Sequence, residues 1–285
     1  GVQDYDPVVQ HAIHRVQPFE FVKEVTEWSR EIGYPSVSHD LVFGLPKQTL
    51  ESVQKTIEKT AELLPDRIAY YSYAHVPWIK GLGQRGFDEN DLPKDEVKRA
   101  LYEIGKEMFD SIGYTEIGMD HFALPTDSLY KSMKKGTLHR NFMGYTSGKT
   151  KLMIGLGMSS ISDSWYGFSQ NLKSVAEYEA AVNEGKLPLL RGHLLSEEDL
   201  IIRQHILNVM CRFETDWSGQ EQLSPIFDGL EKRLQNMSDD GLLEISGSHL
   251  KVTEAGIPFV RNICMQLDAK MLNKEIGEKM FSKTI

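Results

Sequence analysis

The sequence predicts an α/β protein in which a parallel sheet with crossover helices is followed by a smaller, mostly helical domain. From residue 1 to about residue 157, short apolar runs alternate with longer amphipathic stretches, and strands that alternate with helices are typical of parallel sheets. After about residue 190 the pattern changes to amphipathic helices and two short strands. The 285 residues are enough for both parts. We therefore expect a first domain at residues 1–190 and a second at residues 191–285.

The strands of the first domain are predicted from apolar, β-prone runs that end at glycine, proline or polar residues. These strands are expected at residues 1–3, 37–43, 67–73, 114–119 and 151–157. Helices are predicted where apolar residues recur every three or four positions. These helices are expected at residues 18–33, 49–64, 93–112 and 174–184, and a long irregular loop at residues 120–150.

Four or five parallel strands do not close a barrel, because a closed barrel of this class has eight. The sequence therefore predicts either an open sheet or a barrel whose first units are missing. The chain starts Gly-Val-Gln-Asp, without an initiator methionine or a charged and apolar leader. We interpret this start as an internal cut or a processed end.

The second domain is predicted to begin its main helix after Ser196, which with Glu197 and Glu198 forms a favourable helix start. Its helices are expected at residues 197–213, 226–239 and 253–263, with strands at residues 242–245 and 250–252. This order of helix, helix, hairpin and helix is winged-helix-like. It suggests DNA binding as an alternative function, but residues 225–262 carry four basic and six acidic side chains. A DNA reader normally presents a basic face.

The overall composition narrows the possible partners. The formal net charge of −9 argues against a protein that grips a phosphate backbone, so we expect no nucleic-acid partner. No apolar run approaches the ~20 residues of a membrane span, so we expect no membrane partner. Cys211 and Cys264 are the only cysteines. Two distant cysteines form no disulfide framework and fit a reducing, cytoplasmic compartment.

Candidate functional residues lie at the carboxyl ends of the predicted strands, where parallel α/β folds place their chemistry. Asp40 is the sharpest candidate because it stands in an apolar run, where a carboxylate is costly unless it is paired. It is either a ligand contact or a structural partner of a backbone amide or an arginine. His121 is either an acid–base or carboxylate-binding group or a histidine bonded to Asp120.

The loop at residues 120–150 offers a second group of candidates. His139 and Arg140 place two donors side by side. A guanidinium binds carboxylates in a bidentate fork, so the pair suits a polycarboxylate ligand; the alternative is a solvated loop. The sequence contains no Gly-x-Ser-x-Gly elbow, phosphate-binding loop or zinc motif. The residue types alone thus predict an α/β enzyme fragment with a pocket for an anionic ligand.

Seven short strings at these positions occur in one order, and together they resemble the oxygen-independent coproporphyrinogen III oxidases over essentially the whole chain. The strings are Gly1-Val2-Gln3-Asp4, Asp40-Leu41-Val42-Phe43-Gly44-Leu45-Pro46, Ala74-His75-Val76-Pro77, Gly118-Met119-Asp120-His121-Phe122-Ala123, His139-Arg140-Asn141-Phe142-Met143-Gly144-Tyr145-Thr146, Gly155-Leu156-Gly157-Met158-Ser159-Ser160-Ile161-Ser162 and Arg261-Asn262-Ile263-Cys264-Met265. Any one of them is a weak signal, whereas seven in register are specific.

The resemblance implies an incomplete radical S-adenosylmethionine (SAM) β/α barrel with a small, mostly helical C-terminal domain. It implies a [4Fe-4S] cluster held by three cysteines, two SAM molecules and an electron donor for the cluster. A 5′-deoxyadenosyl radical would abstract hydrogen from two propionates of coproporphyrinogen III, and loss of CO2 would leave the vinyl groups of protoporphyrinogen IX.

Site residues are implied position by position. Four residues match family contacts to the second SAM: Gln3, Arg15, Asp40 and Ala74. Ile161 matches a contact to the cluster-bound SAM. His121, His139 and Arg140 become candidates for holding the substrate carboxylates.

The chain departs from the family pattern at the cluster. The Cys-x-x-x-Cys-x-x-Cys motif is absent, and Cys211 and Cys264 cannot replace three thiolates. We therefore expect the chain by itself to bind no metal and to be inactive. A haem chaperone of the same superfamily is the nearest alternative. Its loop reads His-Asn-x-x-Tyr-Trp, which differs from the string that starts at His139 and favours the oxidase.

Overall fold

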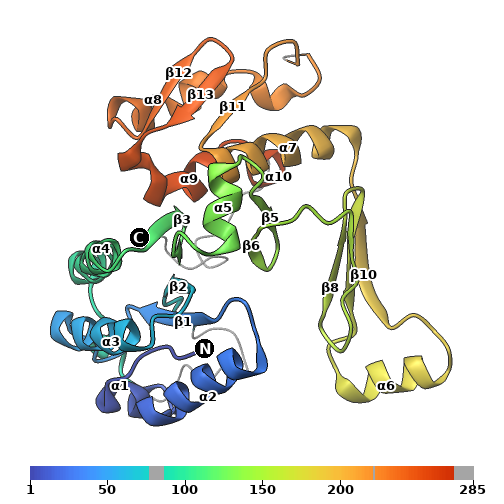
Figure 1. Ribbon diagram of the computed structural model, residues 1–285. Coiled ribbons are helices and arrows are strands. Elements are labelled where there is room, and N and C mark those ends of the chain that lie inside the picture. The colour runs from blue at the N-terminus through green and yellow to red at the C-terminus, as the bar shows by residue number, and fades with distance from the viewer. Residues whose placement is uncertain (77–86, 221, 273–285) are drawn as a thin grey trace. The chain divides into compact units, whose positions relative to one another are not determined.

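The computed structural model describes residues 1–76, 87–220 and 222–272. Their contacts divide the chain into two compact units, of which the first comprises Gly1–Lys131 and the second begins at Ser132 (Figure 1). The division falls inside helix α5 (Ser128–Lys134). It therefore differs from the boundary that the sequence placed after residue 190.

A four-stranded mixed sheet organises the first unit, with the order β1-β2-β4-β3. Its strands are β1 (Ser38–Phe43), β2 (Arg67–Ser72), β3 (Thr115–Gly118) and β4 (His121–Ala123). β1 and β2 are parallel, and Gln3 adds a parallel bridge to Leu41 on the outer edge of β1. The expected strands at residues 37–43, 67–73 and 114–119 are confirmed. β4 was not predicted, and it pairs antiparallel with both β2 and β3, so that β3 does not bond β2 directly.

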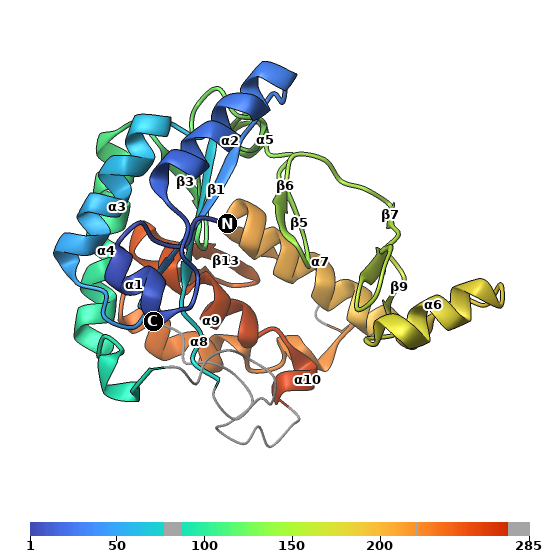
Figure 2. The same ribbon diagram turned by 90° about the horizontal axis from the view of Figure 1, so that it is seen from below.

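Helices cover one face of this sheet (Figure 2). They are α1 (Pro7–Ala12), α2 (Phe19–Ile32), α3 (Leu50–Leu63) and α4 (Asp95–Ser111), with a short 3-10 turn η1 (Glu89–Asp91) before α4. Thr49 and Ser52 form a reciprocal capping box at the start of α3, and Gly33 ends α2 in the left-handed conformation. The apolar faces of the helices, with Val53 and Ile57 of α3 and Leu101 and Phe109 of α4, pack on alternate strand residues. These strand residues are Leu41 and Phe43 of β1 and Ile68 and Tyr70 of β2.

The second unit opens with small antiparallel elements. The hairpin β5 (His139–Asn141) and β6 (Gly144–Thr146) is followed by a second sheet of order β10-β9-β8-β7. Its strands are β7 (Leu152–Met153), β8 (Ile161–Ser164), β9 (Gly167–Asn171) and β10 (Leu189–Leu194), with α6 (Val175–Asn183) between the last two. The loop expected at residues 120–150 is therefore partly ordered, since it holds β4, α5, β5 and β6. These elements are too short for a periodic pattern to reveal.

The prediction of a parallel strand at residues 151–157 is wrong. Only Leu152–Met153 forms a strand, and it pairs antiparallel with β8. The side chain of Asn171 explains the rest, because its Nδ2 donates to the carbonyls of Gly155 and Gly157, both at 3.0 Å. A side chain thus satisfies the backbone groups that a neighbouring strand would otherwise bond.

The remainder of the second unit is mostly helical. It contains α7 (Glu197–Arg212), β11 (Glu214–Asp216), η2 (Pro225–Phe227), α8 (Leu230–Asp239), β12 (Leu243–Ser246), β13 (His249–Val252), η3 (Glu254–Phe259), α9 (Val260–Met265) and α10 (Ala269–Leu272). The helices expected at residues 197–213 and 226–239 and the hairpin β12–β13 are confirmed, whereas the helix expected at residues 253–263 is divided into the 3-10 turn η3 and the short helix α9. β11, which pairs with β13, was not predicted. No helix among the described residues is both long and apolar enough to cross a membrane.

Candidate functional site

The alternation of side chains along β1 separates two adjacent polar residues. His39, Leu41 and Phe43 point into the buried core, whereas Asp40 lies on the opposite, half-buried face. The premise that Asp40 is buried among apolar side chains is therefore wrong. It stands on the face of the sheet that the helices leave uncovered, where a carboxylate is accessible to a ligand.

The register of the sheet brings Asp40 and His121 to the same face. Asp40 pairs with Ala69 across the β1–β2 ladder, and Ala69 pairs with His121 across the β2–β4 ladder. Because adjacent strands lie ~4.8 Å apart, the two side chains stand about 10 Å apart with the small Ala69 between them. The ring of Tyr71 meets the His121 ring edge-on, with 5.8 Å between the centroids. A carboxylate, an imidazole and an aromatic ring thus share one face.

Gln3 and Arg15 join Asp40 at the edge of this sheet. The Gln3 amide N–H donates to the Asp40 carbonyl at 2.7 Å, and Val42 donates to the Gln3 carbonyl at 2.9 Å. Gly1 is required there, because a Cβ at this position would collide with the side chains of Gln3 and Asp40. Arg15 Nη2 donates to the Gly1 carbonyl at 2.7 Å. The structure thus collects an amide, a guanidinium and a carboxylate around residues 1–3.

Ala74 lies just beyond the carboxyl end of β2. The preceding residue, Tyr73, donates its N–H to the Phe43 carbonyl at 2.8 Å, which holds this segment against the end of β1. Lys98 Nζ donates to the Tyr73 carbonyl at 3.1 Å. Ala74 therefore stands at the same edge of the sheet as the end of β1, as expected for a strand-end contact.

Asp4, which the sequence also places at a strand end, is a structural residue. Its side chain is completely buried and accepts hydrogen bonds from Gln48 Nε2 at 2.6 Å, Thr56 Oγ1 at 2.9 Å and the Asp6 N–H at 2.6 Å. These donors tie the first strand to the start of α3. Because Asp4 is buried and its carboxylate already accepts three hydrogen bonds, it supports the position of Gln3 and is not available to contact a ligand.

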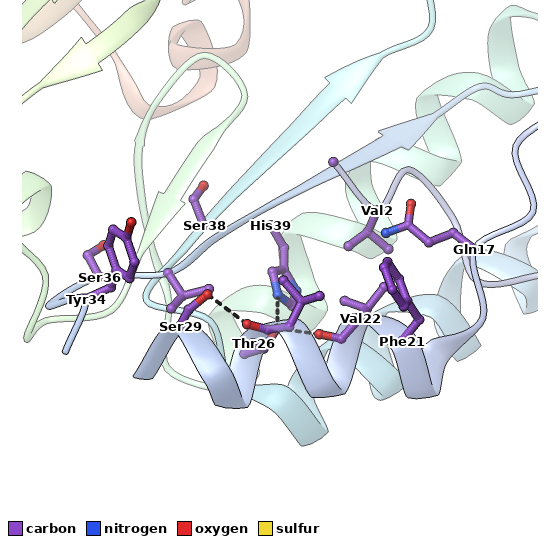
Figure 3. Close-up of a pocket in the computed structure, with 13 residues that line it drawn as sticks. Val2, Gln17, Phe21, Val22, Thr26, Ser29, Tyr34, Ser36, Ser38 and His39 are labelled. Atoms are coloured by element: carbon purple, nitrogen blue, oxygen red, sulfur yellow. Dashed lines mark hydrogen bonds between the residues drawn. The ribbon is translucent and has the colours of Figure 1, made fainter. Parts of the chain in front are cut away.

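His39 lines a hollow of about 330 Å³ between α2 and the start of β1 (Figure 3). Its Nε2 lies 3.0 Å from Thr26 Oγ1, and that hydroxyl donates to the Val22 carbonyl at 2.8 Å. Because the hydroxyl has one proton, Nε2 of His39 carries the proton in their hydrogen bond. Burial, followed by the charge of Arg30, lowers the pKa of His39 to about 4. His39 is therefore neutral at physiological pH.

The second unit holds the remaining sequence candidates. The Arg140 guanidinium stacks on the Tyr145 ring, with 4.7 Å from Cζ to the centroid, and its Nη1 is buried without a hydrogen-bond partner among the described residues. Burial, followed by the positive charges of Lys149 and Arg203, lowers the pKa of His139, whereas Asp163 opposes this change. A buried, unsatisfied guanidinium donor points to an anionic ligand.

Ile161 begins β8 and pairs with Gln170 of β9. Its carbonyl lies so close to Gly155 that a Cβ at Gly155 would stand 2.7 Å from it. The Gly155 N–H also donates to Ser162 Oγ at 3.1 Å. The glycine is therefore required for the close approach of the two segments.

The candidates therefore form two groups. Those in the first unit are Gln3, Arg15, Asp40, Ala74 and His121, and those in the second unit are His139, Arg140 and Ile161. Tyr71 and Lys149 lie beside these candidates but were not predicted from the sequence. A signal for Tyr71 was present, because it lies two residues after Ala69 and therefore on the same face of β2.

The residues present do not fit an iron–sulfur cluster. Cys211 and Cys264 are both buried, and burial raises their pKa values to about 11 and about 12. Within the described ranges, no group of three histidine, cysteine or acidic side chains is arranged to hold a metal ion. The first unit does fit an amino-acid and ribose moiety, because Asp40 supplies an acceptor and Gln3 and Arg15 supply donors at one edge.

Comparisons with known proteins identify relatives of the whole chain. No protein-family model matches the chain. An oxygen-independent coproporphyrinogen III oxidase of Helicobacter pylori (strain J99) is 40% identical over the entire chain, and the Escherichia coli (strain K12) protein of that name is 37% identical. The solved structure of the Escherichia coli coproporphyrinogen III oxidase, described as a radical SAM enzyme, matches 95% of the chain with a TM-score of 0.88 and 38% identity.

The chain covers 63% of the length of each of these relatives. At 37% to 40% identity over every residue, the resemblance that the seven strings suggested is confirmed. The chain is therefore homologous, throughout its length, to the oxygen-independent coproporphyrinogen III oxidases, and its structural neighbour is a radical SAM enzyme.

Proposed function

We propose that the protein to which this chain belongs oxidatively decarboxylates two propionates of coproporphyrinogen III to the vinyl groups of protoporphyrinogen IX. The observation that carries the proposal is the placement of Asp40, Gln3 and Arg15 at one accessible sheet edge, in a chain 40% identical throughout to a protein of that name. Because the chain covers 63% of that relative, the activity is proposed for a longer polypeptide.

In this proposal the first unit binds SAM. Gln3, Arg15, Asp40 and Ala74 contact the second SAM molecule, with the Asp40 carboxylate accepting from its ammonium or ribose hydroxyl groups and Arg15 pairing with its carboxylate. Ile161 contacts the SAM that lies on the cluster. The geometry supports the first set, since Arg15 and Asp40 both contact the segment Gly1–Gln3, which contains Gln3 itself.

The substrate carboxylates are assigned to His121, His139 and Arg140. His121 shares its sheet face with Asp40, and Arg140 Nη1 is a buried donor without a protein partner among the described residues. A guanidinium that stacks on Tyr145 is fixed in orientation, which suits bidentate recognition of a propionate. These residues would bind and orient the porphyrinogen.

The cluster is assigned to residues outside this chain, because the chain has two cysteines and both are buried. We propose that the chain alone is inactive, that it corresponds to part of an incomplete β/α barrel with a winged-helix-like domain, and that it works in the cytoplasm. When bound, the cluster and SAM supply hydrogen abstraction, and a separate electron donor reduces the cluster.

Calorimetric titration of the chain with SAM tests the binding role. We expect binding that Asp40→Asn weakens about tenfold, since a hydrogen bond to a charged group contributes about 1.5–3 kcal/mol. Glu24→Gln is the matched control, because Glu24 is an exposed residue of α2. No SAM binding, or equal loss in both variants, would contradict the assignment.

Two further measurements test the reaction class. After anaerobic iron–sulfur reconstitution, the chain should release no 5′-deoxyadenosine from SAM; measurable product would overturn the assignment of the cluster to other residues. A haem titration should produce no Soret shift, and a stoichiometric haem complex would favour the haem-chaperone alternative.

A further inference from the structure

The most basic part of the chain is the segment of residues 128–162, most of which belongs to the second unit. No acidic residue occurs between Asp127 and Asp163, although the chain carries 41 acidic residues and a net charge of −9. The same interval contains Lys131, Lys134, Lys135, Arg140, Lys149 and Lys151. An acidic protein that concentrates positive charge in one segment creates a local attraction for anions.

This segment forms one wall of a pocket of about 270 Å³ in the second unit. Residues 136–139 and Lys149 line one side, and a single face of α7 lines the other, with Leu207, Cys211 and Arg212. The positive groups Lys149 and Arg212 line it together with His139, whereas no acidic side chain is among the lining residues. The pocket is therefore electropositive, with leucine side chains in its wall.

The positive charge in and beside this pocket is not neutralised within the described chain. Asp163 is bound by Arg203, with 2.8 Å between Oδ1 and Nη2. Lys149 Nζ stands 4.7 Å from the centre of the Trp165 ring, and no described carboxylate pairs with Lys149 or Arg212. Arg140, next to His139, keeps a buried Nη1 without a partner among the described residues. Lys149 and Arg212 are exposed to solvent and therefore accessible to an anionic ligand, and the buried, unsatisfied donor of Arg140 beside them favours one.

We propose that this pocket binds a carboxylate of the tetrapyrrole substrate, and that Lys149 and Arg212 are its carboxylate-binding residues. The inference rests on the proposed function, and it adds two residues that neither the sequence motifs nor the homology assigns. A propionate fits because its carboxylate would meet the two cations while its methylene groups contact Leu207 and Leu138, which also lines the pocket. A pocket of about 270 Å³ does not suit an extended nucleic-acid backbone.

The test is a titration of the 285-residue chain with coproporphyrin III, the air-stable oxidised analogue, followed by the fluorescence anisotropy of the porphyrin. The pocket variant is Lys149→Gln with Arg212→Gln. The control variant is Lys135→Gln with Lys151→Gln, which removes the same charge from the same unit at two exposed residues that do not line the pocket. Circular dichroism checks that both variants are folded.

We expect the pocket variant to lose about tenfold or more in affinity, because charge-assisted hydrogen bonds are about twice as strong as neutral ones. The control variant should lose less than about threefold, since Lys135 and Lys151 do not line the pocket and act on the ligand only through salt-screened, longer-range attraction. Equal losses in the two variants, or no loss in the pocket variant, would overturn the proposal.

A competition experiment distinguishes a carboxylate ligand from a phosphate ligand. Propionate should displace coproporphyrin III at lower concentration than inorganic phosphate does; the reverse order would overturn the carboxylate assignment. The SAM titration is an independent measurement on the first unit. If the parent chain binds SAM and the pocket variant binds the porphyrin as tightly as the parent does, this inference alone is refuted. If the parent chain does not bind SAM, the proposed function is refuted.

Discussion

Lowering the pH from about 7 to about 5 should destabilise the first unit through His39. In the folded chain, burial lowers the pKa of His39 to about 4, against 6.5 for the free side chain. Between these two values the unfolded chain binds a proton that the folded chain does not. The stabilisation from neutral His39 is therefore present above the unfolded pKa and is lost as the pH falls towards the folded pKa.

The magnitude follows from the two pKa values. Each pH unit between 6.5 and about 4 is worth about 1.4 kcal/mol, so the complete loss amounts to about 3 kcal/mol. About 2 kcal/mol of it falls between about pH 7 and about pH 5. This is a large fraction of the stability of a typical domain, which is about 5–15 kcal/mol.

Hydrogen exchange of the α2 and β1 amides at the two pH values measures this loss in the unit that contains His39. His39→Gln should flatten the pH dependence, because a glutamine can donate to Thr26 without titrating. His11→Gln, at an exposed residue of α1, is the matched control and should leave the dependence unchanged. If the parent chain and His39→Gln lose the same protection, buried neutral His39 is not its origin.

Replacing Asp4 with alanine should lower the free energy of unfolding by at least about 2 kcal/mol in urea titrations, since its three hydrogen-bond donors lose their acceptor; a loss below about 0.5 kcal/mol would contradict its supporting role. Gly105→Ala should cost about 1–2 kcal/mol, because the new Cβ would collide with the buried ring of Tyr70. A gain in stability, which helix propensity alone would produce, would count against this close packing. Arg203→Gln should cost about 3 kcal/mol in thermal unfolding of the second unit, as it leaves the buried carboxylate of Asp163 without its partner. An unchanged melting temperature would show that the pair is not needed.

Local pattern was sufficient for much of the fold. The strands at residues 37–43 and 67–73 were predictable because apolar, β-branched runs between turn residues have few other solutions. The helices at residues 197–213 and 226–239 were predictable from their apolar spacing and, for the first, from the cap at Ser196. Pairing partners were not predictable in this way. β4 and β11 are three-residue strands, too short for a local pattern to reveal, and each is bonded by a strand distant in sequence: β4 by β2, in addition to its neighbour β3, and β11 by β13.

The candidate site, like the fold, was only partly predictable from the sequence. Asp40 and His121 were recognisable as candidates from their positions after or within predicted strands, but the reason first given for Asp40, burial, was mistaken. Strand alternation buries His39 and leaves Asp40 on the open face. A shift of the register by one residue would exchange the two, and register is set by pairing with β2.

By itself, the sequence determined the α/β class and most of the helices, because these depend on residues close together in the chain. It also determined the homology to the coproporphyrinogen III oxidases and the lack of three cysteines for a cluster, because these depend on residue identity. Only the tertiary structure decided that Asp40, Ala69 and His121 share one face, that residues 152–153 pair antiparallel, and that Lys149 and Arg212 line one pocket. Those outcomes depend on which distant segments pair and pack, and the free energy of such contacts is not encoded in any local window of the chain.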